Sequence, residues 1–257
     1  MELYDIIGYV DALIGVASYR NGLEAYCIPE LWEYKDGKRC LTIDELYHPL
    51  IKNPVKNTID TQKSILFTGS NASGKSTFLK AAAINVIFAQ TIHTVLGNQY
   101  KACFYRVYSS MALRDDILSK ESYFIVEIKS LKRIFSELSQ DTTPVLCFID
   151  EILRGTNTVE RVAASSQLLE EIAKDNALCF AATHDIELTY LLEDIYANYH
   201  FEELLSEGDV SFDYKLKDGR ANSRNAIRLL EMIGFEQTVV DKSQQRVETF
   251  LEKGIWV

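Results

Sequence analysis

Apolar and polar residues follow two kinds of pattern along the chain. At the start, apolar residues recur at helical spacing and predict an amphipathic helix over residues 1–20. Its apolar positions are Leu3, Ile6, Ile7, Val10, Leu13, Ile14 and Ala17. Frequent glycines and prolines in residues 21–63 then predict loops and short strands.

Short continuous apolar runs predict buried strands in the rest of the chain. They lie at residues 64–67, 102–105, 145–149, 177–182, 197–201 and 210–216. Helical spacing predicts helices over residues 75–89, 125–138, 159–169 and 223–253, the last with a break at Gly234. Apolar strands that alternate with helices are typical of an α/β fold, in which helices cover both faces of a sheet.

Composition and charge argue against several classes of protein, among them disordered chains and domains that mainly bind nucleic acid. The 257 residues are 47% apolar and 25% charged, which excludes wholesale disorder. The net charge of -10 has the wrong sign for a domain that mainly grips phosphate backbones, so we expect any DNA contact to be made elsewhere. The five cysteines include no C-x-x-C pair, which argues against a zinc site and fits a reducing cytoplasm.

One uncharged segment, residues 81–100, has the length of a membrane span. Its polar residues are too many for a helix that faces lipid: Asn85, Gln90, Thr91, His93, Thr94, Asn98 and Gln99. The N-terminus also lacks the features of a signal peptide. We therefore expect a cytoplasmic protein without membrane contact.

Residues 69–76 match the phosphate-binding pattern G-x-x-x-x-G-K-[ST], between a predicted strand and a predicted helix. Gly69 and Gly74 permit backbone torsions that point successive N–H groups at phosphate oxygens. Lys75 would neutralise the β- and γ-phosphates of ATP, and the Ser76 hydroxyl would bind Mg²⁺. The alternative is a chance match in a turn rich in Gly and Ser, and the strand–loop–helix context argues against it.

Polar residues end two other apolar strands. Asp150 and Glu151 follow one of them, where Asp150 could hold Mg²⁺ and Glu151 could act as general base on the attacking water. His184 follows the other and could sense the γ-phosphate by hydrogen bonding. The alternatives are a solvated strand end for the acidic pair and a surface or satisfied histidine for His184. Their combination with the phosphate loop favours a catalytic site.

Five blocks stand in a characteristic order along the chain: His48-Pro49 and residues 68–77, 113–116 with 122–127, 150–158 and 182–188. Together they resemble the motifs of the MutS family of mismatch-repair ATPases. Residues 68–77 resemble its TGPNMGGKST, and residues 113–116 with 122–127 resemble its DD and STFMVE motifs. Residues 150–158 resemble DEIGRGTST, residues 182–188 resemble ATHYxEL, and His48-Pro49 stands where the family has RHP. The resemblance spans nearly the whole chain.

The resemblance implies a P-loop NTPase of the ABC type, with a mostly parallel central sheet flanked by helices. It divides the chain into the end of a helical core region (1–45), the ATPase domain (46–220) and a helical dimerisation segment (221–257). The nucleotide-binding residues would be Gly69, Ser70, Asn71, Ala72, Ser73, Gly74, Lys75, Ser76 and Thr77. Asn71 would also position the water, and Glu127 would have a structural role near the site.

The family also implies partners. Two copies of this chain, or one copy with a related MutS-like subunit, would close on ATP with Mg²⁺ and open on hydrolysis. Ser122 would then reach the γ-phosphate that the other subunit binds. The family's mismatch-reading and clamp regions have no counterpart here, so DNA would be bound through regions outside this chain.

Several positions depart from the family pattern. Ser70 replaces proline, Leu153 replaces glycine, and Lys120-Glu121 replace Gly-Arg before Ser122. No aromatic residue lies in residues 50–59, where the family offers a Phe to adenine, so we expect aliphatic contacts to the base. The acidic charge, Lys120-Glu121 and the missing aromatic residue keep an alternative open. It is a nucleotide-gated dimerisation switch without mismatch recognition, acting in recombination, on ribosomes or on another target.

Overall fold

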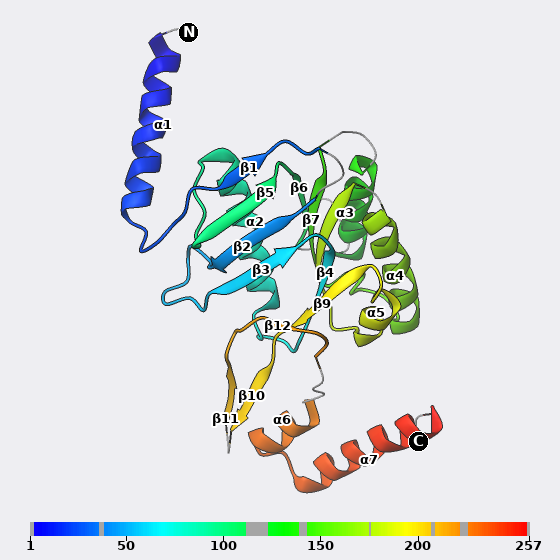
Figure 1. Cartoon of the computed structure of the whole chain (residues 1–257). Helices are drawn as coiled ribbons and strands as arrows, with labels where there is room; N and C mark the ends of the chain where they lie inside the picture. The colour runs from blue at the N-terminus through cyan, green and yellow to red at the C-terminus, as the bar shows by residue number, and fades with distance from the viewer. Residues whose placement is uncertain are drawn as a thin grey trace.

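The computed structural model describes residues 3–35, 39–111, 123–138, 143–174, 176–206, 209–221 and 226–255. These residues form an α/β fold, as predicted, with a six-stranded sheet, a four-stranded sheet and a two-stranded hairpin (Figure 1). None of the helices within the described residues is both long and apolar enough to cross a membrane.

The six-stranded sheet has the order β12-β9-β4-β8-β7-β6. Its strands are β12 (Lys217–Asp218), β9 (Tyr196–His200), β4 (Ser64–Thr68), β8 (Ala177–Ala182), β7 (Val145–Asp150) and β6 (Arg106–Ser110). The pairings from β9 through β6 are parallel, and β12 joins β9 antiparallel. Because β4, β7 and β8 are adjacent and parallel, their carboxyl ends lie side by side. The phosphate loop, the acidic pair and His184 therefore start from one edge of the sheet.

Helices cover both faces of this sheet (Figure 1). Helix α2 (Lys75–Thr91) packs on one face, and α3 (Tyr123–Glu137), α4 (Thr158–Lys174) and α5 (Ile186–Leu191) cover the other. Alternate residues of β7 enter the two cores: Phe148 lies on the α2 side, and Cys147 lies on the side of α3 and α4. Burial on both faces explains why these strands are continuously apolar.

A second sheet packs on the other side of α2. Its order is β1 (Glu30–Trp32), β5 (Gln99–Cys103), β2 (Leu41–Leu46) and β3 (Asn57–Thr61). The single strand predicted at 102–105 is wrong, because that segment is the end of β5 and a turn into β6. The sequence pattern missed β6 because it is a half-buried edge strand without a continuous apolar run.

The strand predicted at 210–216 is also wrong in extent. The chain forms β11 (Asp209–Phe212), which pairs with β10 (Glu203–Ser206) in a hairpin, and then turns before β12. Tyr214 lies in this turn at φ +53°, which ends the extended backbone. The turn brings residues 213–216 back toward β3.

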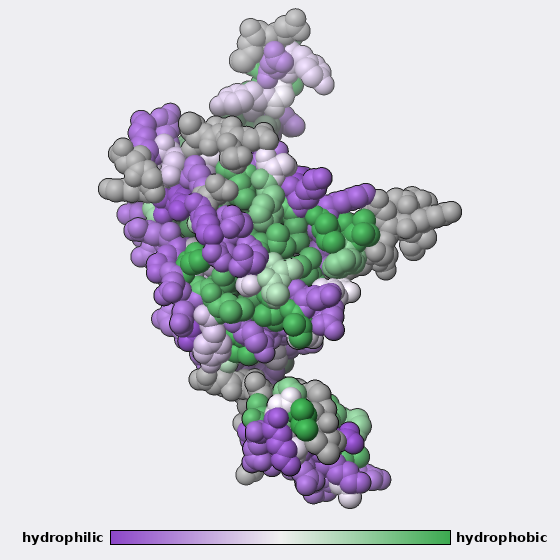
Figure 2. Space-filling model, turned by 90° about the vertical axis from the view of Figure 1, so that its right-hand side faces the viewer, coloured by the Kyte–Doolittle hydropathy of each residue, from purple (hydrophilic) through white to green (hydrophobic). Residues whose placement is uncertain are grey.

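The terminal helices lie apart from the sheets (Figures 1 and 2). Helix α1 (Leu3–Asn21) forms where predicted, but none of its residues is buried, so its apolar positions face solvent. Helices α6 (Ala226–Ile233) and α7 (Gln237–Lys253) pack on each other on either side of Gly234. The division of the chain at residues 46 and 221 stays a prediction.

Candidate functional site

The phosphate loop connects β4 to α2 and buries the side chain of Lys75. That residue is 5% exposed, and its ammonium donates to the carbonyl oxygens of Gly69 and Ser70, each at 2.7 Å. Burial lowers the pKa of Lys75 from 10.5 to about 8, although the carboxylates of Glu151, Asp150 and Glu203 oppose this shift. The loop therefore holds a desolvated positive charge against neutral carbonyls.

The backbone of the loop requires its two glycines. Gly69 has φ +143° and Gly74 has φ +111°, a region that L-residues rarely adopt. A methyl group on Gly69 would lie 2.6 Å from the carbonyl oxygen of Phe201, the residue directly after β9. The start of the loop thus passes directly against the neighbouring strand.

The acidic pair ends β7 at the same edge of the sheet. The Oδ1 atom of Asp150 is buried, and no described residue gives it a hydrogen bond. Glu151 turns away from the strand at φ +59°, and its backbone N–H donates to the Ala182 carbonyl at 2.9 Å. The Glu151 carboxylate lies 2.9 Å from His184 Nε2 through Oε1 and 2.8 Å from Arg154 Nη1 through Oε2. The structure therefore brings Glu151 and His184 together.

Helix α3 supports the loop that follows Glu151. Glu127 of α3 is 2% exposed, and its Oε1 accepts a hydrogen bond from the backbone N–H of Leu153. Burial raises the pKa of Glu127, while the N–H groups of Leu153 and Arg154 oppose this shift. Leu153 itself has φ +54°. The position is therefore a left-handed turn for which the glycine of the family pattern is the usual residue.

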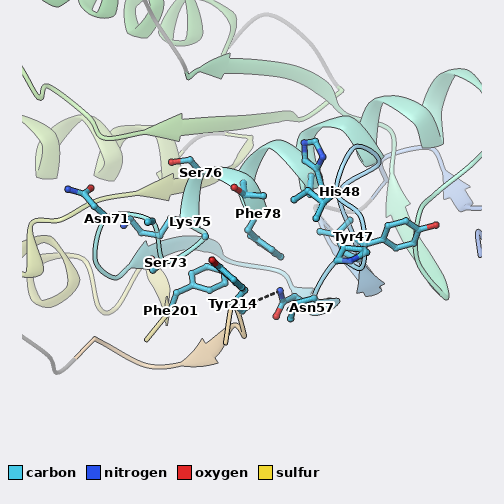
Figure 3. A pocket seen from close by; sticks show the side chains of 18 of the residues that line it. Tyr47, His48, Asn57, Asn71, Ser73, Lys75, Ser76, Phe78, Phe201 and Tyr214 are labelled. Carbon is cyan, nitrogen blue, oxygen red and sulfur yellow. Dashed lines mark hydrogen bonds between the residues drawn. The ribbon is translucent and has the colours of Figure 1, made fainter. Parts of the chain in front are cut away.

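A cavity of about 530 Å³ opens in front of the phosphate loop (Figure 3). Residues 70–77, residues 46–48, residues 51–55 and Glu151 all line it. Its aromatic lining residues include Phe78, Phe201 and Tyr214, which Figure 3 shows beside the loop. Ile51 and Val55 are aliphatic residues that also line it, and the expectation that such side chains contact the base stays a prediction.

Tyr214 is one of several lining residues that the sequence did not predict, together with Tyr47, Phe78 and Phe201. Its ring approaches the phosphate loop so closely that a methyl group on Gly74 would lie 3.2 Å from Tyr214 Cδ1. The residue is 140 positions from Gly74 along the chain, and no motif marks it. The only signal was an aromatic residue in a segment predicted as strand.

The predicted site residues fall into three groups. Ser70 to Thr77 and Glu151 line the cavity together. Gly69, Asp150 and His184 lie at the same sheet edge but are not among the lining residues. Ser122 lies outside the described residues, as do Lys120 and Glu121.

Comparison with known proteins shows which family the chain resembles. The model of the family described as MutS domain V matches residues 65–251. The DNA mismatch repair protein MutS of Streptococcus uberis is 29% identical over 250 residues, which are 92% of this chain and 29% of that protein. The protein of the same name from Roseiflexus sp. is 30% identical over 210 residues (79% of this chain, 19% of that protein).

A third relative, the DNA mismatch repair protein MutS of Pseudothermotoga lettingae, is 26% identical over 266 residues, covering 98% of this chain and 32% of that protein. The chain thus spans about a fifth to a third of the length of these relatives. The family match includes β4, the phosphate loop, the acidic sheet edge and α6. On this match the resemblance read from the motifs is confirmed, and the chain belongs to the MutS family through its MutS domain V.

Proposed function

We propose that this chain is a P-loop NTPase that binds ATP with Mg²⁺ and hydrolyses it, as the motor of a MutS-like mismatch-repair protein. One observation carries the proposal: the buried ammonium of Lys75 and the carboxylate of Glu151 belong to one cavity of about 530 Å³. A cation site for phosphates and a base for water in the same cavity suit phosphoryl transfer to water.

The phosphate loop supplies the binding energy. A triphosphate offers anionic oxygens to the Lys75 ammonium, which otherwise donates to the neutral carbonyls of Gly69 and Ser70. Hydrogen bonds to charged acceptors are stronger, so binding offsets the burial cost that lowers the pKa of Lys75. The amino-terminal end of α2 adds its partial positive charge at the same place.

Asp150 and Ser76 fit a magnesium site. Asp150 Oδ1 is a buried carboxylate oxygen that no described residue satisfies, and Mg²⁺ is bound through one or two carboxylates together with hydroxyls and phosphates. When bound, the ion would neutralise charge on the β- and γ-phosphates.

Glu151 is the proposed general base. Its carboxylate accepts the proton of the attacking water, and His184 and Arg154 hold the two carboxylate oxygens in a fixed orientation. Asn71 is exposed on the loop and lines the cavity, and it would orient that water. His184, which contacts Glu151, would form a hydrogen bond to the γ-phosphate and would lose it when the phosphate is released.

We further propose that ATP binding draws two copies together, with Ser122 of each copy reaching the nucleotide of the other. The relatives are named as DNA mismatch repair proteins, and on that basis DNA binding by attached regions would be controlled by this closure. Mismatch recognition itself would belong to those regions.

Two substitutions test the proposal. Lys75→Ala is expected to abolish ATP turnover, and Glu151→Gln is expected to abolish turnover while ATP still binds and stabilises a dimer in sedimentation. Lys132→Ala, which changes an exposed lysine on α3, is the control and is expected to keep full turnover. Turnover that survives both site substitutions would refute the assigned roles.

A further inference from the structure

We propose that Asn57 is a positioning residue for the nucleobase, because its side-chain amide holds Tyr214 on the wall of the cavity. The inference rests on the proposed function and deepens it, since it names how one end of the cavity recognises the base. It concerns a residue that no motif of the chain contains.

Asn57 joins two distant segments with a pair of hydrogen bonds. It is the first residue of β3 and is 9% exposed. Its Nδ2 donates to the Tyr214 carbonyl at 3.0 Å, the bond that Figure 3 marks with a dashed line. Its Oδ1 accepts from the Leu216 N–H at 2.8 Å. The amide therefore binds the turn on both sides of Lys215, in the way that a neighbouring strand would.

The turn needs such support because Tyr214 has an unfavourable backbone conformation. A tyrosine at φ +53° is strained, and such residues persist where the surrounding structure holds them. The Tyr214 side chain is 45% exposed and stacks on Phe212, with ring centroids 5.8 Å apart. An exposed aromatic ring in a strained turn indicates a ligand contact more than a packing role.

Other side-chain contacts to the turn involve exposed or half-buried charged groups and contribute less. Lys215 Nζ donates to the Lys56 carbonyl at 3.2 Å, and Lys217 Nζ lies 3.1 Å from Asp213 Oδ2. Contacts between solvent-exposed charged groups are weak on average. The buried amide of Asn57 is thus the main restraint on the position of Tyr214.

The surface that Tyr214 presents suits a nucleobase. Its ring lies next to Gly74, where the phosphate loop enters α2, and Ile51, Pro54 and Val55 line the same cavity. An aromatic face with aliphatic neighbours accepts a flat heterocycle rather than a phosphate. The triphosphate belongs to the loop, so the two parts of the ligand depend on different residues.

This separation defines the experiment. The affinities of ATP and of inorganic tripolyphosphate, each with Mg²⁺, are measured by calorimetry for the 257-residue chain and for Asn57→Asp. The change is nearly isosteric, so it leaves no packing void. It places a carboxylate oxygen against the Tyr214 carbonyl oxygen, and the repulsion between the two releases the turn. The ratio of ATP affinity to tripolyphosphate affinity is expected to fall about tenfold, the usual size of a lost base-stacking contact. Tripolyphosphate affinity itself is expected to stay within about twofold.

Gln90 offers a matched control. Its side-chain amide also binds one backbone N–H and one carbonyl, both of Tyr105, at 2.6 and 3.1 Å, and it does not line the cavity. Gln90→Glu is expected to leave the affinity ratio unchanged. Tyr214→Ala, which removes the ring and keeps the clamp, is expected to lower the ratio as Asn57→Asp does.

Three results would count against the inference. Unchanged affinities for both ligands in Asn57→Asp overturn it. An equal loss of both affinities, which also leaves the ratio unchanged, overturns it too and would mean that Asn57 supports the whole cavity. In either case ATP binding by the unsubstituted chain leaves the proposed function standing. If the unsubstituted chain binds neither ligand, the proposed function fails and this inference fails with it.

Discussion

Replacing Lys75 with methionine tests whether the buried charge of Lys75 in the phosphate loop lowers the free energy of unfolding. The pKa of Lys75 falls from 10.5 to about 8 through burial. Each pKa unit corresponds to about 1.4 kcal/mol, so the charged ammonium destabilises the folded chain by about 3 kcal/mol at neutral pH. Methionine has a similar length and no charge, and removes this cost together with the hydrogen bonds to Gly69 and Ser70.

The pH dependence isolates the charge from those hydrogen bonds. Below pH 8 both the folded and the unfolded wild-type chain carry the Lys75 proton, and the full cost is present. Between pH 8 and 10.5 the unfolded chain binds more protons than the folded one, so wild-type stability rises with pH. The free energy of unfolding of Lys75→Met minus that of wild type should therefore fall by about 3 kcal/mol across this window.

The assay is urea unfolding of both proteins at several pH values from 7 to 10.5, a range taken from the pKa shift. Other groups that ionise at high pH do so in both proteins and cancel in the difference. A difference that stays constant with pH would refute the reasoning, because Lys75 would then be hydrated rather than buried. If Lys75→Met is more stable than wild type and no longer binds ATP, the charge of Lys75 lowers stability but is needed for phosphate affinity.

Three further substitutions test the backbone around the site, each by urea unfolding. Gly69→Ala should cost at least about 2 kcal/mol more than Gly219→Ala, because both glycines have positive φ but only a methyl on Gly69 meets a carbonyl, and equal losses would contradict the close approach. Leu153→Gly should relieve about 1 kcal/mol of strain at φ +54° yet lose about 2–3 kcal/mol of side-chain burial. It is therefore expected to destabilise, and a gain in stability would show that strain dominates. Glu127→Ala should cost about 1–3 kcal/mol because it leaves the Leu153 N–H buried without an acceptor, whereas Glu127→Gln keeps an acceptor and should cost less. Equal costs for these two variants would count against the hydrogen bond.

Local sequence predicted the centre of the fold better than its edges. Strands β4, β7 and β8 were predicted because both of their faces are buried, and such strands are continuously apolar. Strand β6 was missed, since an edge strand with half-buried residues has no such run. Helix α1 forms where its apolar spacing predicted a helix, but that spacing did not show what would cover its apolar positions, and none of its residues is buried.

The sequence by itself determined the phosphate loop and the acidic strand end, because the chemistry of each depends on residues that are neighbours in the chain. Backbone torsions of Gly69 and Gly74, and the charge of Lys75, are local properties of a short segment. Only the tertiary structure decided what faces that loop. The Glu151 contact with His184 and the Asn57 contact with Tyr214 join residues 33 and 157 positions apart. Such pairs follow from strand order and from a turn that ends a strand early, and side-chain periodicity within one element carries no information about either.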